Sequence, residues 1–89
     1  MMENVLLKSE DKRSRSEIVT FLNEIAMKID SGMVKLVQGE QSLELEIPEN
    51  LTLEIKVEEK IKPNHPKKMQ LEIELEWYEG DKRESIQLG

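Results

Sequence analysis

The residues most able to do chemistry in this chain are glutamates that recur at alternate positions in three segments. Carboxylates can act as a general acid and base, but one of them must then sit in a dry pocket that raises its pKa. Alternation with aliphatic residues instead places the carboxylates side by side on an open sheet face. We therefore interpret them as a candidate interaction face and predict neither a catalytic nor a metal site. The face comprises Glu44, Glu46, Glu54, Glu58, Glu72, Glu74 and Glu76.

This acidic face has three interpretations. In the first, it is a solvated surface that keeps the sheet soluble and discourages pairing between strand edges. In the second, it docks a basic protein partner or cations, which would offset the repulsion between like charges on neighbouring strands. Mimicry of a nucleic-acid backbone is the third and has no further support in the sequence. A calcium loop would need closely spaced Asp and Asn around a turn glycine, a pattern that the sequence lacks.

The single histidine, His65, lies between Pro63 and Pro66 in a lysine-rich segment, Lys60–Lys68. A catalytic histidine needs a nucleophile and an orienting carboxylate within reach, and no cysteine or placed serine motif accompanies this one. We interpret it as an exposed loop residue. The lysines around it form a possible weak anion-binding loop, but they lack the interleaved aromatic residues that stack on single-stranded nucleic acid.

A second basic group, Lys12, Arg13 and Arg15, lies where a helix is predicted to begin. Free backbone N–H groups and the positive end of the helix dipole can hold a phosphate at such a position, so this group is a candidate anion site. Nearby acidic residues, among them Asp11 and Glu17, compete for the same charges. Local ion pairing and capping are therefore the simpler interpretation.

Composition limits the classes of protein that remain. The chain has 89 residues, which suffice for one domain, and 37% of them are hydrophobic. It has no cysteine, which excludes disulfides, thiolate metal sites and thiol redox chemistry. The net charge of −6 opposes long-range attraction to nucleic acid or an anionic membrane. The apolar run Val5–Leu7 is too short for a signal peptide or a membrane span, so we expect a cytoplasmic protein.

One helix is predicted before the glutamate-rich segments. Ser14 and Glu17 have the spacing of a capping box, and Gly32 can end the helix in the left-handed conformation. Between them, aliphatic and aromatic residues recur every three to four positions and form one apolar stripe. The helix should therefore end at Ser31, about fifteen residues after it begins. The stripe comprises Ile18, Phe21, Leu22, Ile25, Ala26 and Ile29.

After the helix the hydrophobic period changes to two, which predicts strands over 33–37, 43–47, 51–58 and 69–77. A further short strand is predicted at Val5–Leu7, before the helix. Short connections between the later strands imply an antiparallel meander with one buried face, which the apolar stripe of the helix can cover. The predicted fold is α+β and two-layered, one helix packed on a mainly antiparallel sheet, in the order β-α-β-β-β-β.

The predicted core combines the helix stripe with the inward positions of the last two strands. It comprises Phe21, Leu22, Ile25, Leu53, Ile55, Leu71, Ile73 and Trp77. Trp77 shares the parity of the aliphatic residues before it, so its ring should close one end of the core. We predict one domain over residues 1–78. Residues 79–89 then form a tail, which is either a frayed end or an extra edge strand.

Two segments are near copies of one pattern, Leu53–Glu58 and Leu71–Trp77, and the second ends on the only tryptophan. The chain thereby resembles the amphi-Trp domain, a small prokaryotic family named for an amphipathic strand region that ends in tryptophan. The resemblance covers about Leu6 to Trp77 and implies the same architecture. The family has no established activity or catalytic residues, so the resemblance implies no chemistry. Other matching stretches are Ser9–Glu10, Phe21–Leu22, Ile25–Ala26, Gly32 and Pro48.

The sequence therefore predicts a non-enzymatic binding or scaffold domain without a cofactor. Its partner would be a basic protein on the acidic face, or a second copy joined through a strand edge. The alternative is a weak anion or nucleic-acid binder that uses Lys60–Lys68 and Lys12–Arg15, although the negative net charge disfavours nucleic acid. A small enzyme is the third hypothesis and is disfavoured. No membrane partner is expected.

Overall fold

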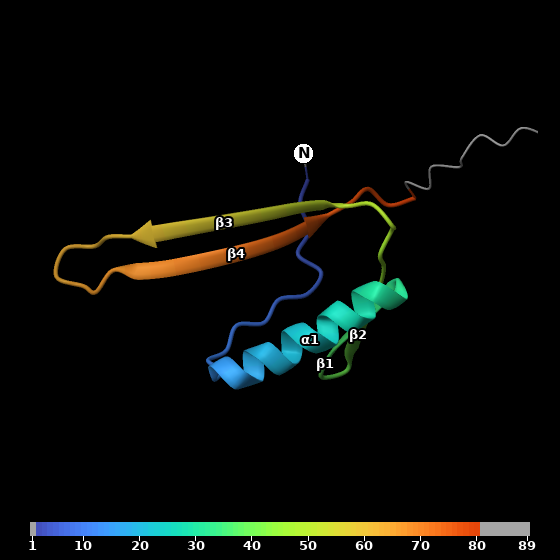
Figure 1. Ribbon diagram of the computed structural model, residues 1–89, viewed down its shortest axis with the longest axis horizontal. Coiled ribbons are helices and arrows are strands. Elements are labelled where there is room, and N and C mark those ends of the chain that lie inside the picture. The colour runs from blue at the N-terminus through green and yellow to red at the C-terminus, as the bar shows by residue number, and fades with distance from the viewer. Residues whose placement is uncertain (1, 81–89) are drawn as a thin grey trace, which may run out of the picture. The chain divides into compact units, whose positions relative to one another are not determined.

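The fold is described by a computed structural model, which covers residues 2–80. It contains helix α1 (Arg15–Ser31) followed by strands β1 (Met33–Gln38), β2 (Gln41–Glu46), β3 (Thr52–Lys60) and β4 (Lys68–Glu76) (Figure 1). The strands are antiparallel, which confirms the predicted α+β class. The chain divides into two compact units, Met1–Ile47 and Pro48–Gly89. No helix in residues 2–80 has both the length and the apolar character that crossing a membrane requires.

Helix α1 begins and ends where the capping residues predict. The Ser14 hydroxyl accepts a hydrogen bond from the Glu17 N–H at 3.2 Å, and the Glu17 carboxylate accepts one from the Ser14 N–H at 3.3 Å. This reciprocal pair satisfies two N–H groups that have no partner within the helix. At the other end Gly32 adopts φ +86°, and its N–H reaches the carbonyls of Ile29 and Lys28. The predicted helix is thus confirmed at both ends.

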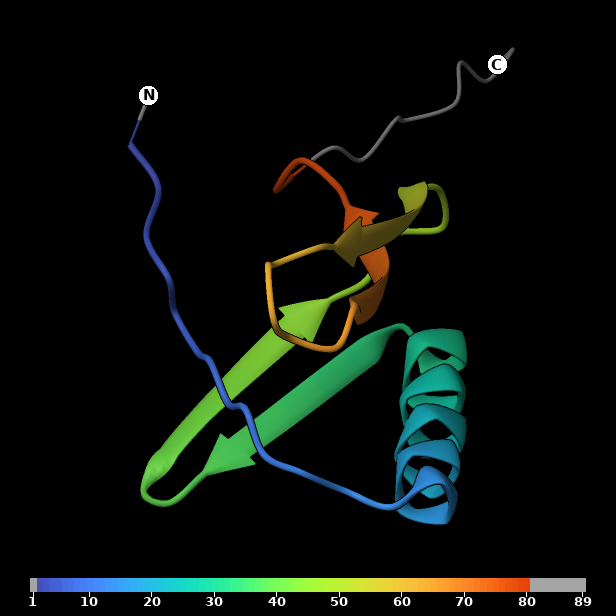
Figure 2. The same ribbon diagram turned by 90° about the vertical axis from the view of Figure 1, so that its left-hand side faces the viewer.

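The first unit joins α1 to a two-stranded sheet (Figure 2). Strands β1 and β2 pair so that Val34 lies opposite Leu45, and Gly39 turns the chain between them with φ +59°. Val34 exposes 5% of its surface and is the only buried hydrophobic residue in the described part of the chain. The Ile47 N–H donates to the Gly32 carbonyl at 2.9 Å, which ties the end of β2 to the start of β1.

The second unit is built on the long hairpin of β3 and β4. Its register is uninterrupted from the pair Thr52 and Glu76 to the pair Lys60 and Lys68. The connecting loop includes Asn64, whose φ of +64° lies in the left-handed region that asparagine tolerates better than most residues. The hairpin therefore holds each residue of β3 opposite a defined residue of β4.

The predicted first strand is wrong. Residues Val5–Leu7 form no regular structure, and Val5 exposes 79% of its surface. A three-residue apolar run is stable as a strand only when a neighbouring strand supplies ladder hydrogen bonds and a surface to pack on. What this segment has instead is one bond near its end, from the Gln38 side-chain amide to the Lys8 carbonyl at 3.2 Å. The observed order is α-β-β-β-β.

The predicted single sheet is also wrong, because the four strands form two separate two-stranded sheets. Strand β2 pairs with β1, and β3 pairs with β4. The connection between the two hairpins contains Pro48, which has no N–H to donate and interrupts a ladder. Alternation of residue types identified each strand but did not identify its neighbour.

The predicted core residues share the expected faces but are not buried as expected. Ile25 and Trp77 are half-buried, whereas the other six expose between 49% and 66% of their surface. Alternation within a strand determines which face a side chain is on. Whether that side chain is buried depends on a second surface that covers the face. The six exposed residues are Phe21, Leu22, Leu53, Ile55, Leu71 and Ile73.

The predicted tail begins with a turn at Glu79 and Gly80. The rest of it, 81–89, lies outside the described residues.

Replacing Gly32 by alanine should destabilise the first unit by about 1 kcal/mol. At φ +86° the Cβ of an alanine comes too close to the carbonyl oxygen that follows it in the backbone. The added Cβ would not collide with neighbouring residues, since the nearest atom, the Ile47 carbonyl oxygen, lies at an ordinary 4.0 Å. Urea unfolding followed by circular dichroism at 222 nm measures the loss.

The matched control is Gly32→Asn, since asparagine adopts the left-handed conformation more readily than alanine. We expect it to lose less stability than Gly32→Ala. Equal unfolding midpoints for the wild type and Gly32→Ala would contradict the assigned role of this glycine in ending α1.

Candidate functional site

The β3–β4 hairpin separates its side chains into two faces of different chemistry. Antiparallel pairing puts directly opposed residues on the same face, and alternate pairs on opposite faces. Glu54 therefore shares a face with Glu74, to which it is paired, and with Thr52 and Glu76 two residues further along. The five hairpin glutamates of the predicted acidic face all fall on this surface, which we call the carboxylate face. Its members are Glu54, Glu58, Glu72, Glu74 and Glu76.

At the open end of the hairpin the carboxylate face carries three clustered carboxylates, none of which forms a salt bridge within residues 2–80. One carboxylate oxygen from each of Glu54, Glu74 and Glu76 lies within 4.8 Å of the other two, and all three residues are exposed. The charge of Glu54 is the main cause that raises the pKa of Glu74, followed by loss of hydration and by the charges of Glu72 and Glu76. The cluster therefore favours a bound proton or another positive charge.

Further along the same face, Lys56 balances its neighbours. Its ammonium group lies 3.0 Å from a Glu58 carboxylate oxygen and 3.7 Å from a Glu72 oxygen. The hydrogen bond to Glu58 is the main cause that raises the pKa of Lys56. The Gln70 side-chain amide also donates to Glu72, at 2.6 Å. The carboxylate face thus has a neutralised centre and an unbalanced open end.

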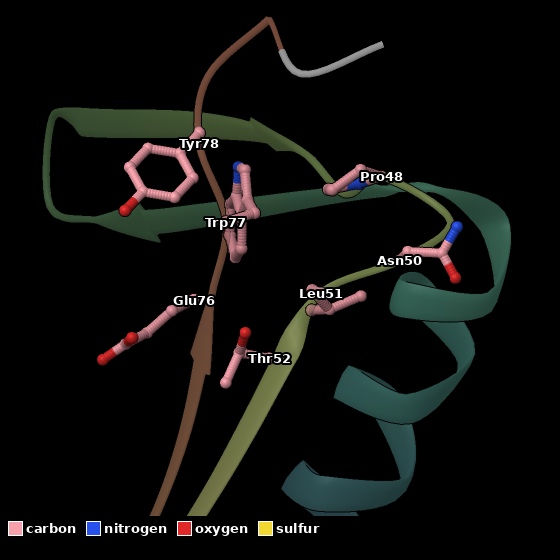
Figure 3. A pocket seen from close by; sticks show the side chains of 7 residues that line it. All are labelled: Pro48, Asn50, Leu51, Thr52, Glu76, Trp77 and Tyr78. Atoms are coloured by element: carbon pink, nitrogen blue, oxygen red, sulfur yellow. The ribbon is translucent and has the colours of Figure 1, made fainter. Parts of the chain in front are cut away.

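A hollow of about 550 Å³ lies at the open end of the hairpin (Figure 3). Trp77 is half-buried there, whereas Tyr78, which also lines the hollow, exposes 85% of its surface. Trp77 was predicted to close one end of the core, and no role was predicted for Tyr78. The sequence did contain a signal for Tyr78, namely two adjacent aromatic residues directly after an amphipathic strand. The hollow is lined by Pro48, Asn50, Leu51, Thr52, Glu76, Trp77 and Tyr78.

Comparison with known families finds a match over almost the whole chain. The model of the Amphi-Trp domain family matches residues 1–88. The chain belongs to the Amphi-Trp domain family. The match confirms the resemblance drawn from the sequence and extends it, because it includes residues on both sides of the stretch from Leu6 to Trp77. No curated protein and no solved structure matches the chain significantly.

The two remaining glutamates of the predicted face lie elsewhere in this Amphi-Trp domain. Glu44 and Glu46 are on β2, in the sheet of the first unit, where Glu44 is paired with Lys35 and Glu46 with Met33. The predicted continuous surface of seven glutamates is therefore divided between two sheets. Glu44 has a cation directly opposite and Glu54 has a carboxylate, so the two positions differ in electrostatic environment although their sequence patterns are alike.

The candidate anion site before α1 is engaged in local ion pairs. The Arg13 guanidinium lies 2.7 Å from an Asp11 carboxylate oxygen and 3.9 Å from a Glu17 oxygen. The hydrogen bond to Asp11 is the main cause that raises the pKa of Arg13. Lys12 and Arg15 are exposed on either side of Ser14. Of the loop lysines, Lys67 lies 3.1 Å from Glu59.

Replacing Glu74 by glutamine should raise the melting temperature at pH 7 by roughly 1–4 °C, because it removes one of several repelling charges. Repulsion raises the pKa of Glu74 above its unfolded value, so the folded chain binds more protons than the unfolded chain. This contribution to stability is present below the unfolded pKa of about 4.3 and is lost as pH rises through the folded pKa. The advantage of the variant should therefore disappear below about pH 4.

Thermal unfolding followed by circular dichroism from pH 3.5 to 7 tests this prediction. Glu44→Gln is the matched control, because it removes a carboxylate that lies opposite Lys35 and should not raise the melting temperature. Equal stabilisation by the two variants, or a Glu74→Gln advantage that persists unchanged at pH 3.5, would contradict the assigned repulsion.

Proposed function

We propose that this Amphi-Trp domain is a non-enzymatic binding domain that docks the lysine and arginine side chains of a basic protein on its carboxylate face. One observation carries the proposal, namely the unbalanced cluster of Glu54, Glu74 and Glu76. Within residues 2–80 no lysine or arginine forms a salt bridge with any of the three. A partner that supplies positive charge would remove the repulsion that the hairpin otherwise retains.

The geometry favours docking over catalysis. General acid–base chemistry needs a carboxyl group in an environment that excludes water and brings a substrate against it. The three clustered glutamates are exposed on one side of a hairpin. Charge on such a surface guides association and determines which partners are repelled. A Ca²⁺ ion takes six to eight oxygen ligands, so the three carboxylates would leave much of its coordination to water.

The alternative of an anion or nucleic-acid site has weaker support. Arg13 in the group before α1 is paired with Asp11, and Lys67 in the hairpin loop is paired with Glu59. A phosphate at either place would have to compete with these carboxylates. The carboxylate cluster faces no such competition within the described residues, and it is the better supported site.

The proposal predicts salt-dependent binding of a basic peptide at the open end of the hairpin. Because exposed ion pairs each contribute little, we expect a dissociation constant on the order of 0.1 mM for an arginine decapeptide in 20 mM salt, and at least fivefold weaker binding in 200 mM salt. The double variant Glu54→Gln/Glu74→Gln should weaken binding at least fivefold in 20 mM salt. Isothermal titration calorimetry measures the affinity, and ¹⁵N chemical shifts locate the contact.

The matched control is Glu44→Gln/Glu46→Gln, which changes the net charge by the same amount on β2. It should bind nearly as well as the wild type. Equal loss in the two double variants would show attraction to net charge alone and would contradict a site on the carboxylate face. Tight binding of single-stranded DNA that is lost in Arg13→Gln/Arg15→Gln would favour the anion-binding alternative instead.

A further inference from the structure

The second face of the β3–β4 hairpin is aliphatic and exposed. The register places Leu53 opposite Leu75, Ile55 opposite Ile73 and Val57 opposite Leu71, whereas Met69 lies opposite Glu59. We call this surface the aliphatic face. Its side chains expose between 37% and 66% of their surface. They are Leu53, Ile55, Val57, Met69, Leu71, Ile73 and Leu75.

The hairpin has no core of its own. No residue in the range 48–80 is buried, and a two-stranded hairpin alone in water is marginally stable at best. Monomeric soluble proteins rarely expose a contiguous apolar patch larger than a few hundred Å², and the largest patch is often functional. The aliphatic face is therefore built to be covered by another surface.

We propose that the aliphatic face is covered by the same face of a second copy of this chain, with the two hairpins antiparallel about a two-fold axis. A two-fold interface needs a patch that is complementary to itself. The three aliphatic pairs meet this condition, because their arrangement is symmetric about the central pair Ile55 and Ile73. Rotation about that centre brings aliphatic pairs onto aliphatic pairs at both ends.

The exposed area of the aliphatic face reaches the lower limit for a specific dimer interface. Seven aliphatic side chains at these exposures offer on the order of 600 Å² in each copy. Two copies would bury about 1,200 Å² in total, which is the lower limit for specific protein–protein interfaces. Sheets that pack face to face, about 10 Å apart, also interdigitate such side chains in β-sandwich cores.

The position of Glu59 decides the antiparallel orientation. Glu59 lies opposite Met69 on the aliphatic face, at the loop end of the hairpin. In the antiparallel arrangement the Glu59 side chains of the two copies lie at opposite ends of the interface. The parallel arrangement would instead bring them to the same end, where like charges repel.

Only one face of the hairpin can form this contact. A dimer through the carboxylate face would take five glutamates out of water, which is unfavourable. On the aliphatic face, Glu59 is the one acidic residue within β3, and Lys67 pairs with it at 3.1 Å. The proposed dimer therefore leaves both carboxylate faces directed to solvent. It does not rest on the basic-partner proposal, because it uses the other side of the hairpin.

Sedimentation velocity between 1 and 500 μM tests the dimer. We expect the 10.4 kDa chain to sediment with twice its mass, and Ile73→Lys to weaken association at least 100-fold, since it buries a charge in the interface. The matched control is Gln70→Lys, which adds the same charge on the opposite face of β4 and should remain dimeric. A wild type that is monomeric at every concentration would overturn the proposal.

A second measurement keeps the test independent of whether Ile73→Lys folds. In a mixed sample of labelled and unlabelled wild-type chains, isotope-filtered NOEs report contacts between copies only. The antiparallel dimer predicts NOEs from the Val57 and Leu71 methyl groups of one copy to the Leu53 and Leu75 methyl groups of the other. NOEs from these methyl groups only to Phe21 and Leu22 of the same chain would overturn the dimer. NOEs between the two Met69 methyl groups would overturn its antiparallel orientation.

Discussion

The register of β3 against β4 is the constraint on which the other features of this Amphi-Trp domain depend. It pairs aliphatic with aliphatic and carboxylate with carboxylate, as at Ile55 with Ile73 and Glu54 with Glu74. A slip of one residue would place glutamates among the aliphatic side chains on both faces. A second surface that covers the aliphatic face would penalise such a slip, because the slip would force charges out of water. Covering this face therefore also protects the register.

The same register has an electrostatic cost that it cannot avoid. Strands that alternate glutamate with aliphatic residues bring carboxylates together whenever they bring the aliphatic residues together. Lys56 offsets this cost at the centre of the hairpin, where it reaches Glu58 and Glu72. At the open end, Thr52 rather than a lysine lies opposite Glu76, and the repulsion around Glu74 remains. Residue choice at a few outward positions therefore determines where the surface attracts cations.

Local features of this fold were predictable from the sequence, and non-local ones were not. The caps at Ser14 and Gly32 depend on residues within one or two turns of the helix, and they were predicted correctly. Strand parity is equally local, so the face of each hairpin residue was predictable. Which strands pair is decided by competition across the whole chain. The division of the glutamates between two sheets, the failure of Val5–Leu7 to form a strand and the hollow beside Tyr78 all depend on such pairing.

Burial on the hairpin is reversed relative to that of a monomeric domain, in which aliphatic residues are inside and charged residues outside. Glu72 is half-buried because Lys56 and Gln70 contact it, whereas its neighbour Ile73 exposes 58% of its surface. Polar side chains can cover one another along a single hairpin, since they are long and carry complementary charges. Aliphatic side chains need a second apolar surface. The hairpin therefore covers the centre of its polar face by itself, whereas its apolar face requires another surface to pack on.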